Sequence, residues 1–141
     1  MAEITKKQIV DKAREYVGTK FQHQARLKDV AVDCIGLIVG IAKELNLFDY
    51  DNKDYQKQSD GTLLMAELKK IMHPIALDVA RPGDLLVFWI QPGTKHAQHI
   101  GIKTDKGLIH THEGVGQVVE TPLSGNWPKR LKYAFAFRGV V

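Results

Sequence analysis

Val32-Asp33-Cys34-Ile35-Gly36-Leu37-Ile38 decides the fold, because a polar stretch ends here and an apolar run at helical spacing begins. Asp33 is a residue type favoured at the N-cap of a helix, and the apolar run continues to about Asn46. Since the first turns are apolar nearly all round, the pattern predicts a central, buried helix. Cys34 would then project from rigid structure at the start of that helix.

Cys34 is the only cysteine of the chain, so an intrachain disulfide is excluded. At the start of a helix, unpaired N–H groups and the positive end of the helix dipole favour a thiolate. We therefore expect the Cys34 thiol to ionise more readily than the thiol of a free cysteine. The plainer interpretation is a buried cysteine that acts as a small hydrophobic residue.

Composition and charge are those of an ordinary globular protein. The length of 141 residues predicts one domain spanning 1–141, and 44% hydrophobic residues argue against disorder. The net charge is +4, but the Lys and Arg residues are scattered, so we predict no nucleic-acid partner. We predict no membrane segment because no apolar run is long enough, and no secretory signal because Met1–Lys7 lacks an apolar core.

Helical patterns fill the first half of the chain and strand patterns the second, which predicts the α+β class. Apolar spacing and capping signals predict further helices from the Thr5–Gln8 capping box to Gly18 and from Thr62 to Met72, with loops at 19–32 and 49–60. Pro74 is expected to stop the second of these helices. Five strands are predicted in the second half, at Leu85–Trp89, His99–Lys103, Leu108–His112, Val118–Thr121 and Leu131–Arg138.

The two strands at His99–Lys103 and Leu108–His112 form a predicted hairpin with a turn at 104–107. If Lys103 pairs with Leu108, His99 lies opposite His112, and His110 is its diagonal neighbour on the same face. This histidine pair would face the space where the Cys34 helix docks. One imidazole could take the thiol proton and the other could orient it, which is the outline of a cysteine peptidase.

A zinc site is the competing interpretation of the same histidines. His96-x-x-His99 and His110-x-His112 could bring several nitrogens together, and a zinc site needs three protein ligands. Against zinc, the strands place no Asp or Glu on that face, and Cys34 would have no role. We therefore predict neither a metal nor a cofactor, and we expect His96 on a solvated loop.

The chain resembles the NlpC/P60 cell-wall peptidases, a compact papain-like group, and is most similar to their phage-tail branch. The blocks that carry the resemblance keep the family's order over most of the chain: Tyr16–Gln24 with Asp33–Leu37, Arg81–Leu86, His99–Ile102 with Leu108–His110, and Trp127–Arg130 leading to Phe137-Arg138.

The resemblance implies a papain-like NlpC-type fold, in which the cysteine-bearing helix packs on an antiparallel sheet. It implies that Cys34 is the nucleophile, His99 the base and His110 the residue that orients His99. His112 stays an alternative orienting residue, because the hairpin is one residue shorter than the commoner form. The implied substrates are bacterial peptidoglycan stem peptides, cut between D-glutamate and a diamino acid, without a cofactor.

Two departures from the family pattern concern the active site. Ile35 replaces the serine that most members carry after the cysteine. Phe21 stands where many members have a tyrosine whose hydroxyl reaches the active site. Contacts to the oxyanion or the substrate are therefore expected from the Cys34 backbone N–H together with Gln24 or His23.

The resemblance to the phage-tail branch also implies where the protein acts. We expect a protein made in the cytoplasm, associated with a phage or prophage tail, that acts at the bacterial cell wall, with tail proteins as possible partners. Two other classes remain open: a structural tail component with the same fold, and an acyltransferase or amidase that acts outside the wall.

Overall fold

The computed structural model of the chain describes residues 3–48, 51, 62–89, 99–112 and 114–141. Its helices are α1 (Lys6–Glu15), α2 (Cys34–Glu44), α3 (Thr62–Ile71) and α4 (Trp127–Arg130), with a short 3₁₀ helix η1 (Leu77–Val79). Its strands are β1 (Lys20–Phe21), β2 (Arg26–Leu27), β3 (Ala31–Val32), β4 (Met72–Ile75), β5 (Leu85–Phe88), β6 (His99–Thr104), β7 (Gly107–His112), β8 (Gln117–Thr121) and β9 (Leu131–Phe137). His96 and most of the loop predicted at 49–60 lie outside the described residues.

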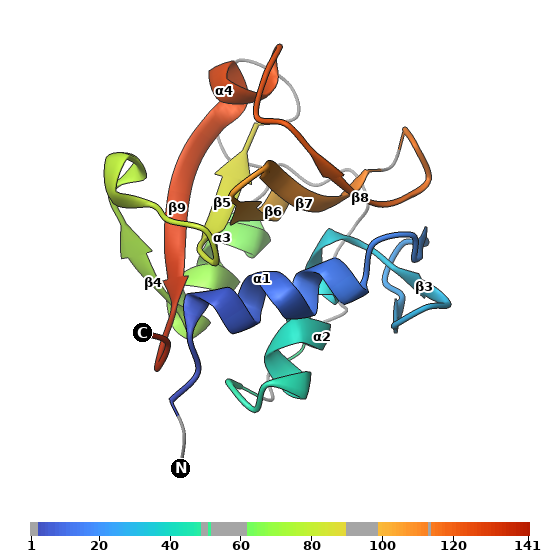
Figure 1. Cartoon of the computed structure of the whole chain (residues 1–141), viewed down its shortest axis with the longest axis horizontal. Helices are drawn as coiled ribbons and strands as arrows, with labels where there is room; N and C mark the ends of the chain where they lie inside the picture. Colours follow the sequence, from blue (N-terminus) through green and yellow to red (C-terminus); the bar gives the residue numbers. More distant parts are fainter. Residues whose placement is uncertain (1–2, 49–50, 52–61, 90–98, 113) are drawn as a thin grey trace.

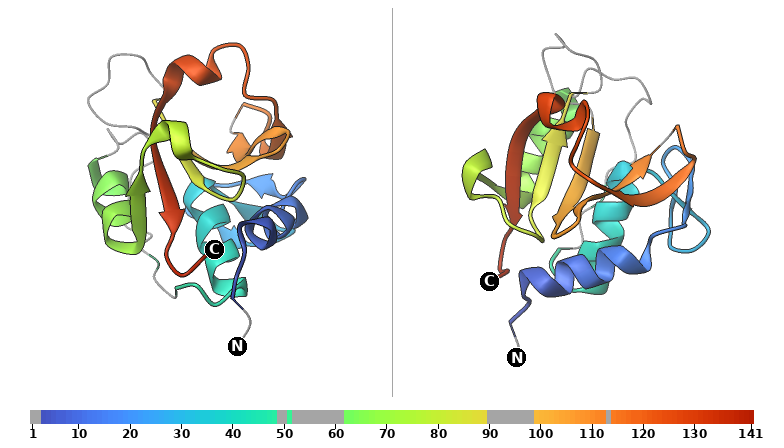
Figure 2. Two further views of the ribbon diagram at one scale, coloured as in Figure 1. Left: turned by 60° about the vertical axis from the view of Figure 1, so that its left-hand side comes forward. Right: turned by 45° about the horizontal axis from the view of Figure 1, so that its top comes forward.

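The described strands form one curled sheet in the order β2-β3-β1-β8-β7-β6-β5-β9-β4. The strands from β8 to β4 pair antiparallel with their neighbours, whereas β1 and β3 form a parallel pair near the other edge. In Figure 1 the β4 edge and the β3 edge lie at opposite sides of the molecule, with α1 running between them. Figure 2 shows the same mixed arrangement of sheet and helices from two further sides, so the α+β class is confirmed.

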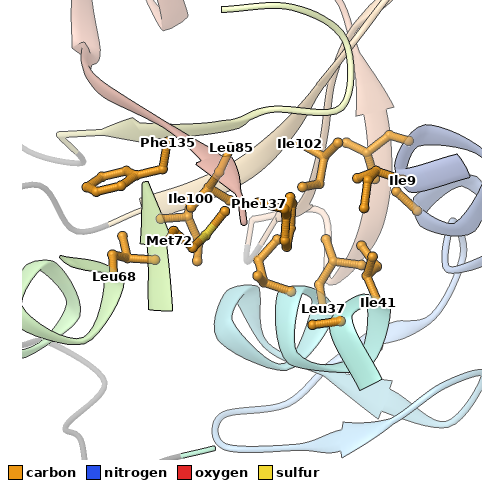
Figure 3. Close-up of a cluster of buried hydrophobic side chains, with 14 of the residues drawn as sticks. Ile9, Leu37, Ile41, Leu68, Met72, Leu85, Ile100, Ile102, Phe135 and Phe137 are labelled. Carbon is orange, nitrogen blue, oxygen red and sulfur yellow. The ribbon is translucent and has the colours of Figure 1, made fainter. Parts of the chain in front are cut away.

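Two hydrophobic clusters lie on the two faces of the sheet. The larger one joins α1, α2 and α3 to alternate residues of the central strands, and Figure 3 shows its members Ile9, Leu37, Leu68, Ile100 and Phe135 among others. The smaller one contains Leu86, Phe88, Leu108 and Ala134, with Trp127 and Leu131 packed against it. Because side chains alternate along a strand, residues two apart on β5, β6 or β7 belong to the same face.

Local capping signals locate the starts of the first two helices. The Thr5 hydroxyl accepts a hydrogen bond from the Gln8 N–H at 3.2 Å, and the Gln8 side chain accepts one from the Thr5 N–H at 2.8 Å. The Asp33 carboxylate accepts a hydrogen bond from the Gly36 N–H at 2.7 Å, as an N-cap residue does. Both helix starts were predicted from sequence and are confirmed.

Two expectations about the chain trace are wrong. The segment predicted as a loop at 19–32 contains β1, β2 and β3, each only two residues long. The helix predicted over about Thr62 to Met72 is present at Thr62–Ile71, but Pro74, which was expected only to stop it, lies inside the unpredicted strand β4. Pro74 is accommodated there because β4 is the edge strand of the sheet, where a missing N–H costs no ladder bond on the open side.

Within the described residues, none of the helices is both long and apolar enough to cross a membrane.

Candidate active site

The buried carboxylate of Asp33 organises the start of α2. Besides the Gly36 N–H, it accepts a hydrogen bond from the Gln24 N–H at 2.8 Å. Arg26 contacts the same carboxylate through Nη1 at 3.0 Å and contacts Asp51 through Nε at 3.0 Å. One side chain therefore fixes both the helix that carries Cys34 and the loop that precedes β2.

Gly36 allows this loop to approach the helix closely. A Cβ atom at position 36 would lie 2.2 Å from the backbone oxygen of Ala25, which is far inside van der Waals contact. Any side chain here would push the 22–26 loop away from the start of α2. The glycine of the sequence motif thus has a packing reason.

The surroundings of Cys34 shift the pKa of its thiol in both directions. Burial of the sulfur and the neighbouring Asp33 carboxylate raise the pKa of the Cys34 thiol to about 12, against the backbone N–H groups of Ile100, Ile35 and Cys34, which lower it. The expectation that the helix start would make this thiol more acidic than a free cysteine is therefore wrong. The helix N–H groups act as predicted, but desolvation outweighs them.

The hairpin of β6 and β7 has the predicted turn, and Lys103 pairs with Leu108. Pairing ends at Ile102 and Ile109, however, so the register does not continue to bring His99 opposite His112. Instead, Nε2 of His99 lies 2.7 Å from Nδ1 of His110. Because the strands stop pairing before they reach the histidines, His99 bonds to His110, its diagonal neighbour, and not to His112.

A hydrogen-bonded chain runs on from His110. Its Nε2 atom lies 3.2 Å from the hydroxyl oxygen of Thr121 on β8. If Nε2 of each ring carries its proton, His99 donates to His110 and His110 donates to Thr121, with every bond satisfied. In that arrangement Nδ1 of His99 is a free acceptor, and it has no hydrogen-bond partner within the part of the chain that the structure describes.

Both rings of the pair are removed from water, since His99 is 7% exposed and His110 is fully buried. Burial, aided by the charges of His110 and His112, lowers the pKa of His99 to about 3. Burial and His112 likewise lower the pKa of His110 to about 4. Both rings are therefore neutral at pH 7, the state in which His99 can accept a proton.

His112 has a different role in the structure. Its Nδ1 atom accepts a hydrogen bond from the Val115 N–H at 3.2 Å, which closes the turn after β7. Its ring centroid lies 5.4 Å from that of His110, and its side chain is partly exposed. The geometry thus favours His110 over His112 as the partner of His99.

The start of α2 meets the hairpin at residues adjacent to the histidines. The Ile100 N–H lies against the Cys34 thiol, and the Thr111 hydroxyl donates to the Asp33 backbone oxygen at 3.2 Å. His99 pairs with Phe88 of the smaller cluster, so both rings lie on the face opposite α2, contrary to the expectation that they would face its docking space. Cys34 packs against the larger cluster, on the side of the sheet where α2 lies. Among the described residues, no hydrogen bond joins its thiol to His99.

Gln24 and His23, from which oxyanion or substrate contacts are expected, and Phe21, which stands in place of the family's tyrosine, lie in the segment that precedes α2. Phe21 pairs with Val32, two residues before Cys34. Gln24 has a left-handed backbone conformation, with φ of 63°, and its N–H is held by Asp33. His23 precedes Gln24 in the same turn and is partly exposed.

Trp127 is a further residue of the site, which sequence reasoning used only as part of a family pattern. Its ring packs against those of His99, His110 and His112. No local signal could have placed it there, because the contact joins α4 to strands that precede it in the chain. Among the described residues, no three His, Cys, Asp or Glu side chains are grouped so that they could hold a metal ion.

Comparison with known proteins gives one family match. A family model described as the NlpC/P60 family matches residues 18–135 of the chain. None of the curated proteins matches it.

Several solved structures have the same fold. A family protein from Bacillus cereus has a TM-score of 0.74 at 15% identity, covering 96% of this chain and 41% of its own. The NlpC/p60 domain of the peptidoglycan hydrolase SagA has a TM-score of 0.65 at 19% identity, covering 95% and 100%. RipD from Mycobacterium tuberculosis, described as a non-catalytic NlpC/p60 protein adapted to peptidoglycan binding, has a TM-score of 0.59 at 16% identity, covering 94% and 96%. The chain spans less than half the length of the larger relatives.

Proposed function

From the fact that this chain belongs to the NlpC/P60 family, whose members are typically peptidoglycan hydrolases, we propose that it is a cysteine peptidase that hydrolyses amide bonds of peptidoglycan stem peptides. The observation that carries the proposal is the buried His99–His110 hydrogen bond, next to the strand residue whose N–H contacts the Cys34 thiol. Acyl transfer through a thioester requires a neutral, oriented base and a thiol, and here the residue that follows His99 contacts the thiol at the helix start.

The proposed mechanism uses Cys34, His99 and His110 as a triad. Nδ1 of His99 takes the thiol proton as the sulfur attacks the amide carbon, and the resulting imidazolium protonates the leaving amine when the C–N bond breaks. Water, deprotonated by His99, then attacks the thioester and releases the acid and the thiol. His110 holds His99 through Nε2 in both protonation states, because that nitrogen keeps its proton throughout.

The raised pKa of Cys34 sets a requirement for this mechanism. A thiol that is neutral at rest must lose its proton during the attack, so the base has to act in the same step. The Cys34 N–H, with Gln24 or His23, is proposed to bind the oxyanion, since the loop that carries both residues is fixed to the helix start by Asp33.

The finer assignment follows the resemblance to the phage-tail branch. We propose that the bond cut lies between D-glutamate and the diamino acid, and that the protein is associated with a phage or prophage tail and acts at the cell wall. Support comes from the blocks of sequence shared with that branch, including Trp127–Arg130.

A non-catalytic, peptidoglycan-binding role is the second candidate. It is favoured by the pKa of Cys34, which is raised to about 12, and by the existence of a non-catalytic relative of the same fold. In that case the hydrogen bond between His99 and His110 would only stabilise the fold.

Mass spectrometry on defined stem peptides separates the two. The wild-type protein should release a fragment that begins at the free amine of the diamino acid, and the Cys34→Ser variant should release none. Binding of the peptide without any cleavage by wild-type protein would instead establish the second candidate.

A further inference from the structure

Trp127 sits at the centre of a group of aromatic rings that includes the proposed catalytic pair. Its ring centroid lies close to four others: 4.9 Å from His110, 5.4 Å from Phe88, 5.7 Å from His99 and 6.1 Å from His112. Phe88 is fully buried and supports the indole at an interplanar angle of 75°. The indole is therefore held in place by the sheet rather than free to swing.

The position of the indole matters because the hydrogen bond beneath it joins two strands that no longer pair. Between His99 and His110 the backbone ladder has ended, so the side-chain bond has to be kept dry by other groups. A hydrogen bond is stronger and better oriented where water is excluded. The indole meets the His110 ring at 87°, an edge-to-face geometry that also limits rotation of that ring.

The contact with His99 has a different geometry. The two rings are inclined by only 34°, with centroids 5.7 Å apart. The indole therefore packs against both rings of the pair.

We propose that Trp127 is a positioning residue that shields the His99–His110 hydrogen bond from water and so holds His99 in its orientation. The inference rests on the proposed function, because the orientation of His99 matters for catalysis only if His99 is the base of that reaction. Trp127 lies on α4, outside the proposed triad, so this role adds a residue of α4 to those that support catalysis.

The groups that face the pair determine the direction of the expected change. His110 and His112 face His99 from β7, Phe88 faces it from β5, and the Cys34 thiol lies beside the neighbouring Ile100 N–H. The hydroxyl of Thr121 is the remaining partner of the pair, on His110. Burial is the main cause of the low pKa values of both rings, so hydration of the pair should raise them toward 6.5.

Histidine-ring NMR titration tests the inference without any turnover, in a Cys34→Ala background. Trp127→Ala should raise the pKa of His99 by about 1 or more, and Trp127→Phe should stay close to the parent protein. Tyr133→Ala, which removes an exposed aromatic side chain from β9, should change neither histidine. An unchanged His99 titration in Trp127→Ala would overturn the proposal. If that variant does not fold, an unchanged titration in Trp127→Gln, which puts a polar side chain at the same position, would do so.

Steady-state kinetics with stem peptides provide a second test of the role of Trp127. Trp127→Ala should lower kcat by about 3- to 30-fold with little change in KM, because His99 loses its fixed orientation, and Trp127→Phe should restore most of the loss. Equal losses in the Ala and Phe variants would contradict a role for the aromatic ring. Absence of hydrolysis by the wild-type protein would refute the proposed function, whereas the titration result alone decides whether Trp127 shields the pair.

Discussion

His99 and His110 share a buried hydrogen bond of 2.7 Å between Nε2 of the first ring and Nδ1 of the second. This bond uses one nitrogen of His99 and leaves the other for a proton. It also makes the two rings a unit, so that replacing either one leaves a buried polar group without its partner.

The three histidines of the hairpin should differ in their effect on hydrolysis. His99→Ala should abolish turnover, and His110→Ala should lower it by about 10²- to 10⁴-fold, because an oriented base becomes a poorly oriented one. His112→Ala should have the smallest effect, since its Nδ1 bonds to the Val115 N–H in a turn. Steady-state rates on a stem peptide measure the order, and a larger loss for His112→Ala than for His110→Ala would assign the orienting role to His112.

Alkylation kinetics should reveal the environment of Cys34. Because burial and the Asp33 carboxylate raise the pKa of this thiol, the pH midpoint of its reaction with iodoacetamide should lie above the value of about 8.5 for a free cysteine. Asp33→Asn keeps an N-cap side chain but removes the charge, so it should lower the midpoint by about 1 pH unit. A wild-type midpoint below 8.5 would contradict this expectation and would show that the helix-start N–H groups outweigh burial.

The buried histidines should make the protein sensitive to acid. Their pKa values of about 3 and 4 in the folded state lie below the unfolded value near 6.5, so the unfolded chain binds protons that the folded one does not. The contribution of these rings to the free energy of unfolding is fully present above pH 6.5. As the pH drops toward 4, the free energy of unfolding should fall by about 1.4 kcal/mol per pH unit for each ring.

Urea unfolding between pH 7 and pH 4 measures this slope. A double variant, His99→Gln with His110→Gln, should lose most of it, while a change at the exposed His73 of β4 should leave it as in the wild type. Equal slopes in the double variant and the wild type would assign the acid sensitivity to other groups.

Chelation separates thiol chemistry from zinc chemistry. With Cys34 as nucleophile, EDTA should leave hydrolysis unchanged and iodoacetamide should remove it. A zinc enzyme would show the reverse, because the chelator withdraws the ion that activates water. Product formation from a stem peptide, followed in parallel with and without each reagent, gives the answer.

The sequence allowed prediction of those features that depend on residues close together in the chain. The capping pairs at Thr5 and Asp33 located two helix starts, because the side chain and the N–H it binds lie three residues apart. The two-residue strands β1, β2 and β3 have no period to detect, and Pro74 in β4 resembles a helix stop until its place at the sheet edge is known.

The site shows the same division. Strand alternation put His99, His110 and His112 on one face, but the choice between the last two depends on where the β6–β7 ladder ends. That end coincides with the start of α2, which contacts both strands, and no pattern within the hairpin encodes it. The pKa of Cys34 was misjudged for a similar reason, because desolvation depends on everything packed around the sulfur.

The hydrogen bonds of Asp33 to Gly36 and Gln24 have a consequence for how the proposed active site can diversify. Because one carboxylate positions both the start of α2 and the neighbouring loop, a change that moves the loop also moves the Cys34 sulfur. New substrate preferences are thus more accessible through partly exposed positions such as His23 than through Gln24, Arg26 or Gly36, which have to change in concert. The site combines a fixed chemical centre with a small set of positions at which selection can act separately.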